Sequence, residues 1–281
     1  MSCIEKCKFI IPKCYLSLSR SKFIVLKLPT HYRKNIPFFY NKNETEFQKD
    51  PYERFDPMVV RQTAIHLADV IWDKYPLQDV LDFAKAYLPK GKMPTILEIG
   101  CSTGRWIAEV AQVYPESTCW GMDYSYQMLK RARDYWVGGH DIYLDFRGQG
   151  FPKTLELKGT RLGNLQFGLA KASELPFLNE SQNLILHSFL LDRLDDLKKA
   201  LIEMYRVLAN GGQMIFVTPL NFQKAKDWEQ YDPPIKIYQL LIELGFDVLE
   251  WKEDLIIWEP LDFRGNSIKW KCIGVVVVKN G

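Results

Sequence analysis

The feature that most restricts the fold of this chain is a glycine turn between a short apolar segment and an amphipathic one. Residues 95–99 (TILEI) have the composition of a fully buried strand, and residues 103–114 carry apolar side chains at helical spacing. Gly100 and Gly104 lie at the turn between them, and glycine lets the backbone turn tightly and lets a ligand approach it closely. A buried strand that leads through such a turn into a helix is typical of α/β proteins.

The same alternation of strand and helix patterns continues from residue 56 to the end of the chain. Strands are predicted at residues 95–99, 118–122, 165–169, 183–187, 213–218, 248–251 and 269–278, and helices at residues 56–75, 77–88, 103–114, 125–136, 194–208 and 234–244. Strands that alternate with helices form a parallel sheet with helices on both faces. In such sheets, ligands bind beyond the carboxyl ends of the strands, so we expect functional residues directly after strands.

The composition excludes several classes of protein. Hydrophobic residues make up 47% and charged residues 25% of the chain, which is the balance of an ordinary globular protein. No segment has the roughly 18 consecutive apolar residues that a membrane helix needs. Residues 1–34 carry a net charge of +7 and the remainder −4, so a basic extension precedes a mildly acidic body. We therefore predict a cytoplasmic protein with a small-molecule substrate and without a membrane or nucleic-acid partner.

The cysteines do not predict a metal site. Cys3, Cys7 and Cys14 have neither the paired spacing of a zinc site nor a neighbouring histidine. Cys119 and Cys272 lie in apolar strand patterns, where a cysteine is most simply a small core residue. We therefore expect no metal cofactor.

Two carboxylates near the glycine turn indicate the kind of ligand. The spacing G-x-x-x-G without a lysine matches neither the G-x-G-x-x-G of a dinucleotide site nor a P-loop. Glu98 comes two residues before the first glycine, where it suits a cationic ligand better than a pyrophosphate. Asp123 follows the next predicted strand, where a carboxylate can accept hydrogen bonds from both hydroxyls of a ribose. The pattern therefore favours a cationic ligand that carries a ribose.

Four segments in this order resemble the motifs of class I S-adenosylmethionine-dependent methyltransferases. They are LEIGCSTGR (residues 97–105), GMDYS (121–125), KASELPF (171–177) and LANGGQMIFVTP (208–219). The resemblance implies a Rossmann-like fold with a seven-stranded, mostly parallel sheet whose last strand runs antiparallel, here with an N-terminal extension. It also implies that S-adenosylmethionine binds over the first three strands.

The resemblance assigns roles to residues of this chain. Gly100 to Gly104 would shape the methionine pocket, Glu98 would orient the loop or reach the cofactor's amino group, Asp123 would hold the ribose, and Tyr124 would lie along the adenine. The predicted cofactor-binding residues are Glu98, Gly100, Cys101, Ser102, Gly104, Asp123, Tyr124, Met128, Lys171, Ala172, Ser173 and His187.

Two of these positions leave alternatives open. Lys171 stands where the family has an aspartate, and a lysine cannot accept a hydrogen bond from the adenine amino group. Ser173, Glu174 or the backbone alone would then take that role. His187 ends a predicted strand, where it could act as a base, or equally be a structural or cofactor-flanking histidine.

Other segments resemble a narrower family, the methyltransferase domain at the C-terminus of the ovothiol-biosynthesis sulfoxide synthase. They are residues 32–40, 50–57, 120–136 and 188–196. This resemblance implies N-methylation of the imidazole ring of 5-thiohistidine. It also suggests three parts: a basic extension (1–27), a lid and substrate platform with its helices (28–90), and the methyltransferase core (91–281). The lid segment could instead be a structural strap along the sheet edge.

An amino-acid substrate of this kind sets demands on the acceptor site. A ring nitrogen offers its lone pair without prior deprotonation, so the enzyme mainly aligns it with the methyl group, and an acceptor for the other ring nitrogen would orient the ring. An arginine suits the substrate carboxylate. The candidates are Tyr52, Arg54, Gln62, Ser188, Asp192, Arg193 and Asn221. Asp192 could instead cap the helix at 194–208, and Arg54 could form a surface ion pair.

Overall fold

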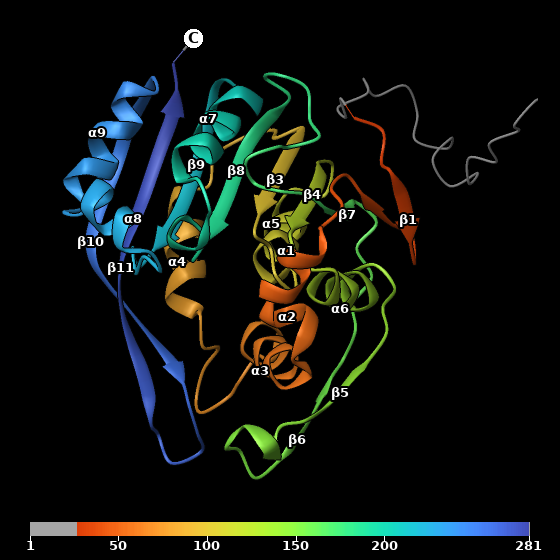
Figure 1. Ribbon diagram of the computed structural model, residues 1–281. Coiled ribbons are helices and arrows are strands. Elements are labelled where there is room, and N and C mark those ends of the chain that lie inside the picture. The colour runs from red at the N-terminus through yellow and green to blue at the C-terminus, as the bar shows by residue number, and fades with distance from the viewer. Residues whose placement is uncertain (1–26, 281) are drawn as a thin grey trace, which may run out of the picture.

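A single large sheet forms the centre of the computed structural model, which describes residues 27–280 (Figure 1). Seven of its strands lie in the order β7 (Leu165–Leu169), β4 (Thr118–Asp123), β3 (Thr95–Ile99), β8 (Gln182–Ser188), β9 (Leu208–Thr218), β11 (Ser267–Lys279) and β10 (Phe246–Pro260). The pairs from β7 to β9 are parallel, and β11 is antiparallel to both of its neighbours. The predicted Rossmann-like class is therefore confirmed, with the last strand antiparallel.

The N-terminal segment adds two further strands to this sheet. β1 (His31–Arg33) pairs with β2 (Ile36–Phe38), which joins the edge of β7 in parallel. The backbone N–H of Phe39 continues this pairing by donating to the carbonyl of Leu169 at 2.8 Å, and Ile36 is fully buried. The sheet thus has nine strands, two more than predicted, because residues 31–38 extend its edge.

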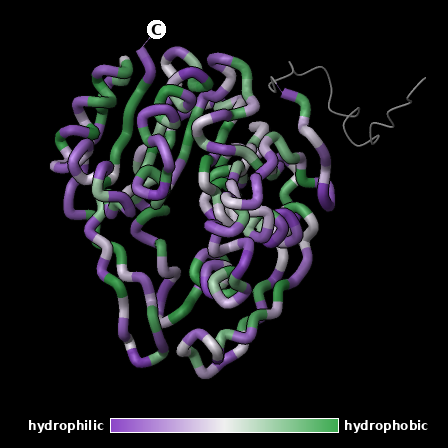
Figure 2. Tube along the Cα trace, viewed as in Figure 1, coloured by the Kyte–Doolittle hydropathy of each residue, from purple (hydrophilic) through white to green (hydrophobic). Residues whose placement is uncertain are grey.

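Alternating side chains of the strands divide the apolar interior into two cores. On β3, Ile96 packs into the core under α4 (Gln78–Tyr87), α5 (Arg105–Val113) and α6 (Tyr126–Trp136). Its neighbour Leu97 packs into the opposite core, under α7 (Leu197–Val207) and α9 (Ile235–Glu243). Hydrophobic residues accordingly follow the central strands in Figure 2. The helices therefore cover both faces of the sheet, as expected for this fold class.

Three short helices precede the core and lie beside the carboxyl ends of β3, β4 and β7 in Figure 1. They are α1 (Glu44–Lys49), α2 (Pro51–Arg54) and α3 (Asp56–Leu67). α3 ends well before the predicted residue 75, because Ala68 has an extended backbone conformation. These helices are packed over the sheet edge where ligands bind in this fold class.

Two hairpins depart from the sequence prediction. Residues 138–163, which have no clear periodicity, contain β5 (Ile142–Asp145) and β6 (Thr154–Leu157), separated by the 3-10 helix η2 (Arg147–Gln149). β10 is much longer than the predicted strand at 248–251 and forms with β11 a hairpin that projects beyond the sheet (Figure 1). The helix α8 (Ala225–Tyr231) and the 3-10 helix η3 (Leu191–Arg193) complete the order of elements.

Two of the predictions concern the first residues of the chain. Cys3, Cys7, Cys14 and the basic extension up to residue 26 lie outside the described residues. Within residues 27–280, no helix combines the length and apolarity that crossing a membrane requires.

Candidate functional site

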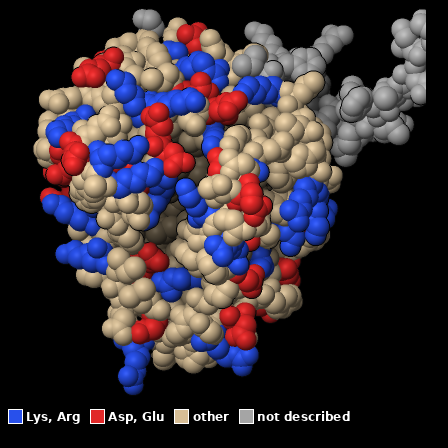
Figure 3. All heavy atoms as spheres, in the orientation of Figure 1, with Lys and Arg blue, Asp and Glu red and all other residues tan. Residues whose placement is uncertain are grey.

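A cleft of about 820 Å³ opens at the carboxyl ends of β3, β4, β7 and β8. Figure 3 shows a hollow near the centre of the surface, with side chains of both charges around it. One wall consists of strand ends and the loops after them, with Gly100, Asp123, Ala170 and Ser188. The facing wall comes from the N-terminal segment, with Glu46, Asp50, Tyr52, Gln62 and His66, and Glu259 and Trp270 of the long hairpin also line the cleft. Three separate parts of the chain thus enclose one site.

The glycine loop has the backbone conformation that its sequence predicts. Gly100 and Gly104 have φ angles of +70° and +76°, in the left-handed region that favours glycine. The N–H of Gly100 donates to the carbonyl of Met122 at 2.8 Å, which fixes the loop to β4. A Cβ atom on Gly104 would lie only 2.6 Å from the ring of Phe167. Gly100 therefore lines the cleft, whereas Gly104 permits close packing behind it at the start of α5.

Asp123 has the geometry of an acceptor for two hydroxyl groups. Its two carboxylate oxygens accept from the backbone N–H groups of Ser102, at 2.7 Å, and Ser125, at 2.8 Å. These bonds fix the orientation of the carboxylate and leave each oxygen with a free lone pair. Burial raises the pKa of Asp123, which the two backbone hydrogen bonds oppose. The residue lines the cleft, so its carboxylate can accept from a ribose there.

Glu98 lies behind the glycine loop rather than in the cleft. Its carboxylate accepts from the N–H of Ile107 at 2.9 Å, and burial, together with the charge of Asp123, raises its pKa to about 8. Glu98, Cys101 and Trp106 line a separate cavity of about 20 Å³, which has room for about one water molecule. The buried Nε1 of Trp106 has no hydrogen-bond partner among the described residues. This arrangement fits the expected role of Glu98 in shaping the loop.

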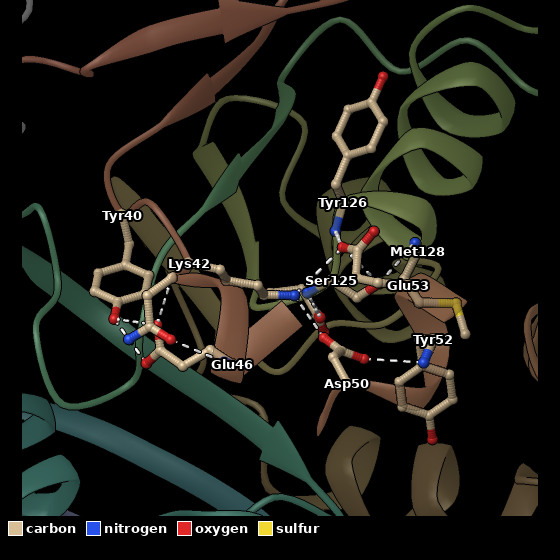
Figure 4. A network of polar contacts seen from close by, with 11 residues as sticks. Tyr40, Lys42, Glu46, Asp50, Tyr52, Glu53, Ser125, Tyr126 and Met128 are labelled. Carbon is tan, nitrogen blue, oxygen red and sulfur yellow. Dashed lines mark hydrogen bonds and ion pairs between the residues drawn. The ribbon is translucent and has the colours of Figure 1, made fainter. Parts of the chain in front are cut away.

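A buried ion cluster fixes the N-terminal wall of the cleft (Figure 4). The Nζ of Lys42 lies 2.5 Å from Asp50 and 3.3 Å from Glu53, and the three side chains are only 7%, 6% and 5% exposed. Glu53 in turn accepts from the backbone N–H of Tyr126 at 2.6 Å, at the start of α6. Carboxylates are stabilised at helix N-termini. The cluster therefore joins the N-terminal segment to the helix that follows Asp123.

Lys171 has a carboxylate partner from the N-terminal segment. It forms an ion pair with Glu46 of α1, which also accepts from the hydroxyl of Tyr40 at 2.7 Å and the N–H of Asn43 at 3.0 Å. Burial alone would raise the pKa of Glu46, but the bonds from Lys171, Asn43 and Tyr40 lower it to about 2. The carboxylate of Glu46 is thus present at this side of the cleft, although Lys171 stands where the family resemblance implies an aspartate.

The structure brings most of the predicted cofactor-binding residues together. Those that line the cleft are Gly100, Ser102, Asp123, Tyr124, Met128, Lys171, Ala172 and Ser173, whereas the predicted residues Glu98, Cys101 and Gly104 do not line it. His187 does not belong to this group, because its ring is fully buried and stacks on Phe216 at a centroid distance of 4.5 Å. Burial lowers the pKa of His187 to about 3. The prediction of His187 as a cofactor contact is not supported by this placement; the next residue, Ser188, faces the cleft instead.

The predicted substrate-positioning residues are divided between the cleft and other places. Tyr52, Gln62, Ser188 and Arg193 line the cleft. Arg54 is exposed and donates to the carbonyl of Gln48 at 2.8 Å, and Asn221 is exposed outside the cleft. Asp192 is buried, 3.4 Å from the hydroxyl of Thr218. It does not cap α7 either, since Asp196 accepts from the N–H of Lys199 at 2.9 Å.

The residues of the cleft wall that were not predicted from the sequence include His66, Glu259 and Trp270. His66 extends a row with Met58 and Gln62 on one face of α3, and this four-residue spacing was a usable signal. Glu259 accepts from Nε1 of Trp270 at 2.9 Å and pairs with Arg61 at 3.2 Å. No local sequence pattern indicated Glu259 or Trp270, because the approach of these residues to the cleft depends on the length of β10 and β11.

Comparison with known proteins gives a consistent result at the level of the family. A family model described as a methyltransferase domain matches residues 66–250. The demethylmenaquinone methyltransferase of Listeria welshimeri is 30% identical over 124 residues, which are 44% of each chain. The ubiquinone/menaquinone biosynthesis C-methyltransferase UbiE of Psychromonas ingrahamii is 40% identical over 87 residues, 30% of this chain and 33% of the relative. The chain thus spans less than half of the length of these curated relatives.

Solved structures share the fold at low sequence identity. A putative methyltransferase in complex with the Trm112 methyltransferase activator of Haloferax volcanii has a TM-score of 0.58 at 15% identity, over 83% of this chain and 98% of that one. A putative methyltransferase of Bacillus halodurans has a TM-score of 0.51 at 15% identity, over 73% of this chain and 100% of that one. At this identity, the likeness concerns the fold.

Proposed function

The chain belongs to the methyltransferase domain family, and from this premise we propose that it methylates a ring nitrogen of 5-thiohistidine, in the biosynthesis of ovothiol. It is an S-adenosylmethionine-dependent methyltransferase with a Rossmann-like fold. The identity of the methyl acceptor is our proposal, and it rests on the charged and aromatic residues that line the cleft.

The cleft residues fit the cofactor in chemical type. Asp123 would accept hydrogen bonds from the ribose hydroxyls, because each of its oxygens keeps a free lone pair. Tyr124 and Ala172 would flank the adenine, and Gly100 would allow the methionine end to approach the backbone. When bound, S-adenosylmethionine supplies an activated methyl group, so the protein's task is to align an acceptor with it.

The observation that carries the proposed acceptor is a pair of opposite charges beside aromatic rings in the same cleft. Arg193 and Glu259 both line the cleft, together with Phe189 and Trp270. Burial, together with the negative charges of Asp123 and Glu259, raises the pKa of Tyr52, whereas the positive charge of Arg193 lowers it. Both charged residues therefore act on the Tyr52 hydroxyl. An arginine, a carboxylate and flat apolar surfaces suit a zwitterionic amino acid with a planar ring.

A second candidate acceptor is an aromatic quinol. The curated relatives named above are quinone methyltransferases, and Met58, Ile65 and Leu190 give the cleft an apolar part. An isoprenoid quinol has no carboxylate or ammonium, so it would form no ion pair with Arg193 or Glu259, whose partners within the protein are Asp192 and Arg61. This difference favours the amino acid.

Incubation of the purified protein with methyl-labelled S-adenosylmethionine and three acceptors tests the proposal. The acceptors are 5-thiohistidine, histidine and demethylmenaquinol, and mass spectrometry detects the label. We expect 5-thiohistidine to gain one labelled methyl group and S-adenosylhomocysteine to inhibit this transfer, because both forms of the cofactor share the cleft. Labelling of demethylmenaquinol in preference to 5-thiohistidine would contradict the proposed acceptor.

A further inference from the structure

One side chain of the cleft has chemistry that the predicted site does not use. The sequence contains four histidines, and His66 is the one that lines the cleft. It also lines the small cavity beside Glu98 and Gly100, so its ring stands where the cleft meets the glycine loop. Ser188 likewise lines both spaces. His66 therefore lies next to the end of the cleft where the methionine part of the cofactor is expected.

The ring of His66 makes no hydrogen bond within residues 27–280. Its neighbours on the same face of α3, Met58 and Gln62, also line the cleft, so this helix face is directed toward the ligand space and not into the core. The titratable groups that share the small cavity with it are Glu98, Tyr75 and Cys101, and Tyr52 lines the main cleft. A polar ring in a ligand cleft without a protein partner is available to a ligand.

His66 is a hydrogen-bond acceptor at neutral pH. Burial lowers its pKa to about 4, so the ring is uncharged and one of its nitrogens keeps a lone pair. No nearby charge contributes to this shift, which follows from the burial of the ring. Such a ring accepts a hydrogen bond from an N–H group but does not attract a carboxylate.

We propose that His66 accepts a hydrogen bond from the ring N–H of the imidazole acceptor and thereby directs the other ring nitrogen toward the methyl group. This inference rests on the proposed function and names the residue that orients its substrate. The free ring nitrogen attacks the methyl carbon, the bond between that carbon and the sulfonium sulfur breaks, and its electron pair stays on sulfur. The ring becomes a methylimidazolium that keeps its N–H, and it releases a proton to water after it leaves the cleft.

The hydrogen bond would be stronger in the transition state than with the bound substrate. As the new bond forms, positive charge moves from sulfur to the acceptor ring, and the N–H group that His66 holds becomes a cationic donor. Hydrogen bonds with one charged partner are about twice as strong as neutral ones. An interaction that strengthens in this way accelerates the chemical step and is not limited to substrate binding. His66 is therefore a catalytic residue in this proposal.

Two substitutions test the proposal by kinetics. His66→Phe keeps a flat ring without an acceptor, and we expect kcat to fall roughly 10- to 100-fold, as for the loss of a hydrogen bond with a charged partner. His66→Ala should lose as much, and added imidazole should restore part of its kcat but none in His66→Phe, where the ring fills the space. The affinity for S-adenosylhomocysteine, measured by calorimetry, should stay the same in both. His140→Phe, at an exposed histidine, is the matched control.

Three results would overturn the proposal. They are a kcat of His66→Phe within about threefold of the wild type, a failure of imidazole to restore His66→Ala, and a weaker affinity of either variant for S-adenosylhomocysteine. The last result would mean that His66 contacts the cofactor instead of the methyl acceptor.

An acceptor other than 5-thiohistidine would refute the proposed function without deciding the role of His66. The ring resonances of His66 are then followed by NMR while imidazole is added to the wild-type protein saturated with S-adenosylhomocysteine. A shift of these resonances, absent for His140, supports the proposal. Unchanged resonances overturn it.

Discussion

Replacement of Lys42 by methionine should lower the free energy of unfolding by about 3–5 kcal/mol, the usual cost of removing one partner from a buried ion pair. The lysine is the cation of a cluster whose other members, Asp50 and Glu53, are about 95% buried. Without it, two carboxylates would remain in a poorly hydrated space, where Asp50 already acts to raise the pKa of Asp123. The N-terminal wall of the cleft would then be destabilised together with the start of α6.

Urea unfolding followed by tryptophan fluorescence measures this effect. Lys74→Met is the matched control, because Lys74 pairs with Asp79 at 3.2 Å but its side chain is 52% exposed. An exposed pair contributes about 1 kcal/mol or less. Equal losses of stability in the two variants would contradict the structural role that we assign to the Lys42 cluster.

Replacement of Asp123 by alanine should weaken the binding of S-adenosylhomocysteine by about 2–3 kcal/mol, which corresponds to roughly 30- to 150-fold in affinity. The variant loses a charged acceptor whose position is fixed by Ser102 and Ser125, and hydrogen bonds to a charged group are among the stronger ones. It also loses the two bonds that hold the loops after β3 and β4.

Calorimetry measures the affinity, and thermal unfolding of the same samples separates a binding defect from a folding defect. Asp145→Ala is the control, because Asp145 is 57% exposed and pairs only with Arg147 in the described part of the chain. A folded Asp123→Ala protein whose affinity stays within about threefold of the wild type would show that the ribose is bound elsewhere.

The strands whose bounds could be predicted most closely are those whose residues are buried on both faces of the sheet. β3 was predicted at its observed bounds, and β4 within one residue, because a short, mostly apolar run specifies a central parallel strand. β1 could not be predicted in this way, since all three of its residues are exposed. Its partner β2 depends on the contact between Phe38 and Leu169, which are far apart in the chain.

The same limit applies to the site. Gly100 and Asp123 were predicted because a local pattern of strand, turn and acid specifies them. Glu46, His66 and Glu259 come from two other parts of the chain, and apart from the four-residue spacing that includes His66, only the fold brings them to the cleft. His187 was assigned to the cleft, whereas Ser188 faces it, because the sequence did not specify which of two neighbours on β8 points to the ligand.

The role of residues 28–66, as a lid or as a structural strap, stays a prediction. β2 pairs with the sheet edge at β7, and residues of α1 to α3 line the facing wall of the cleft. The division of the chain at residues 28–90 and 91–281 stays a prediction. The buried contacts of Ile36, Lys42 and Glu53 lead us to expect that the two parts fold together.

A crystal structure of the protein with S-adenosylhomocysteine tests the central claim most directly, namely that the cleft between the strand ends and the N-terminal helices binds the cofactor. We predict that both ribose hydroxyls lie within hydrogen-bond distance of Asp123. The adenine should lie beside Tyr124 and Ala172, and the homocysteine end should lie next to Gly100. A complex in which the ribose points away from Asp123, or in which the ligand occupies another part of the molecule, would contradict the account.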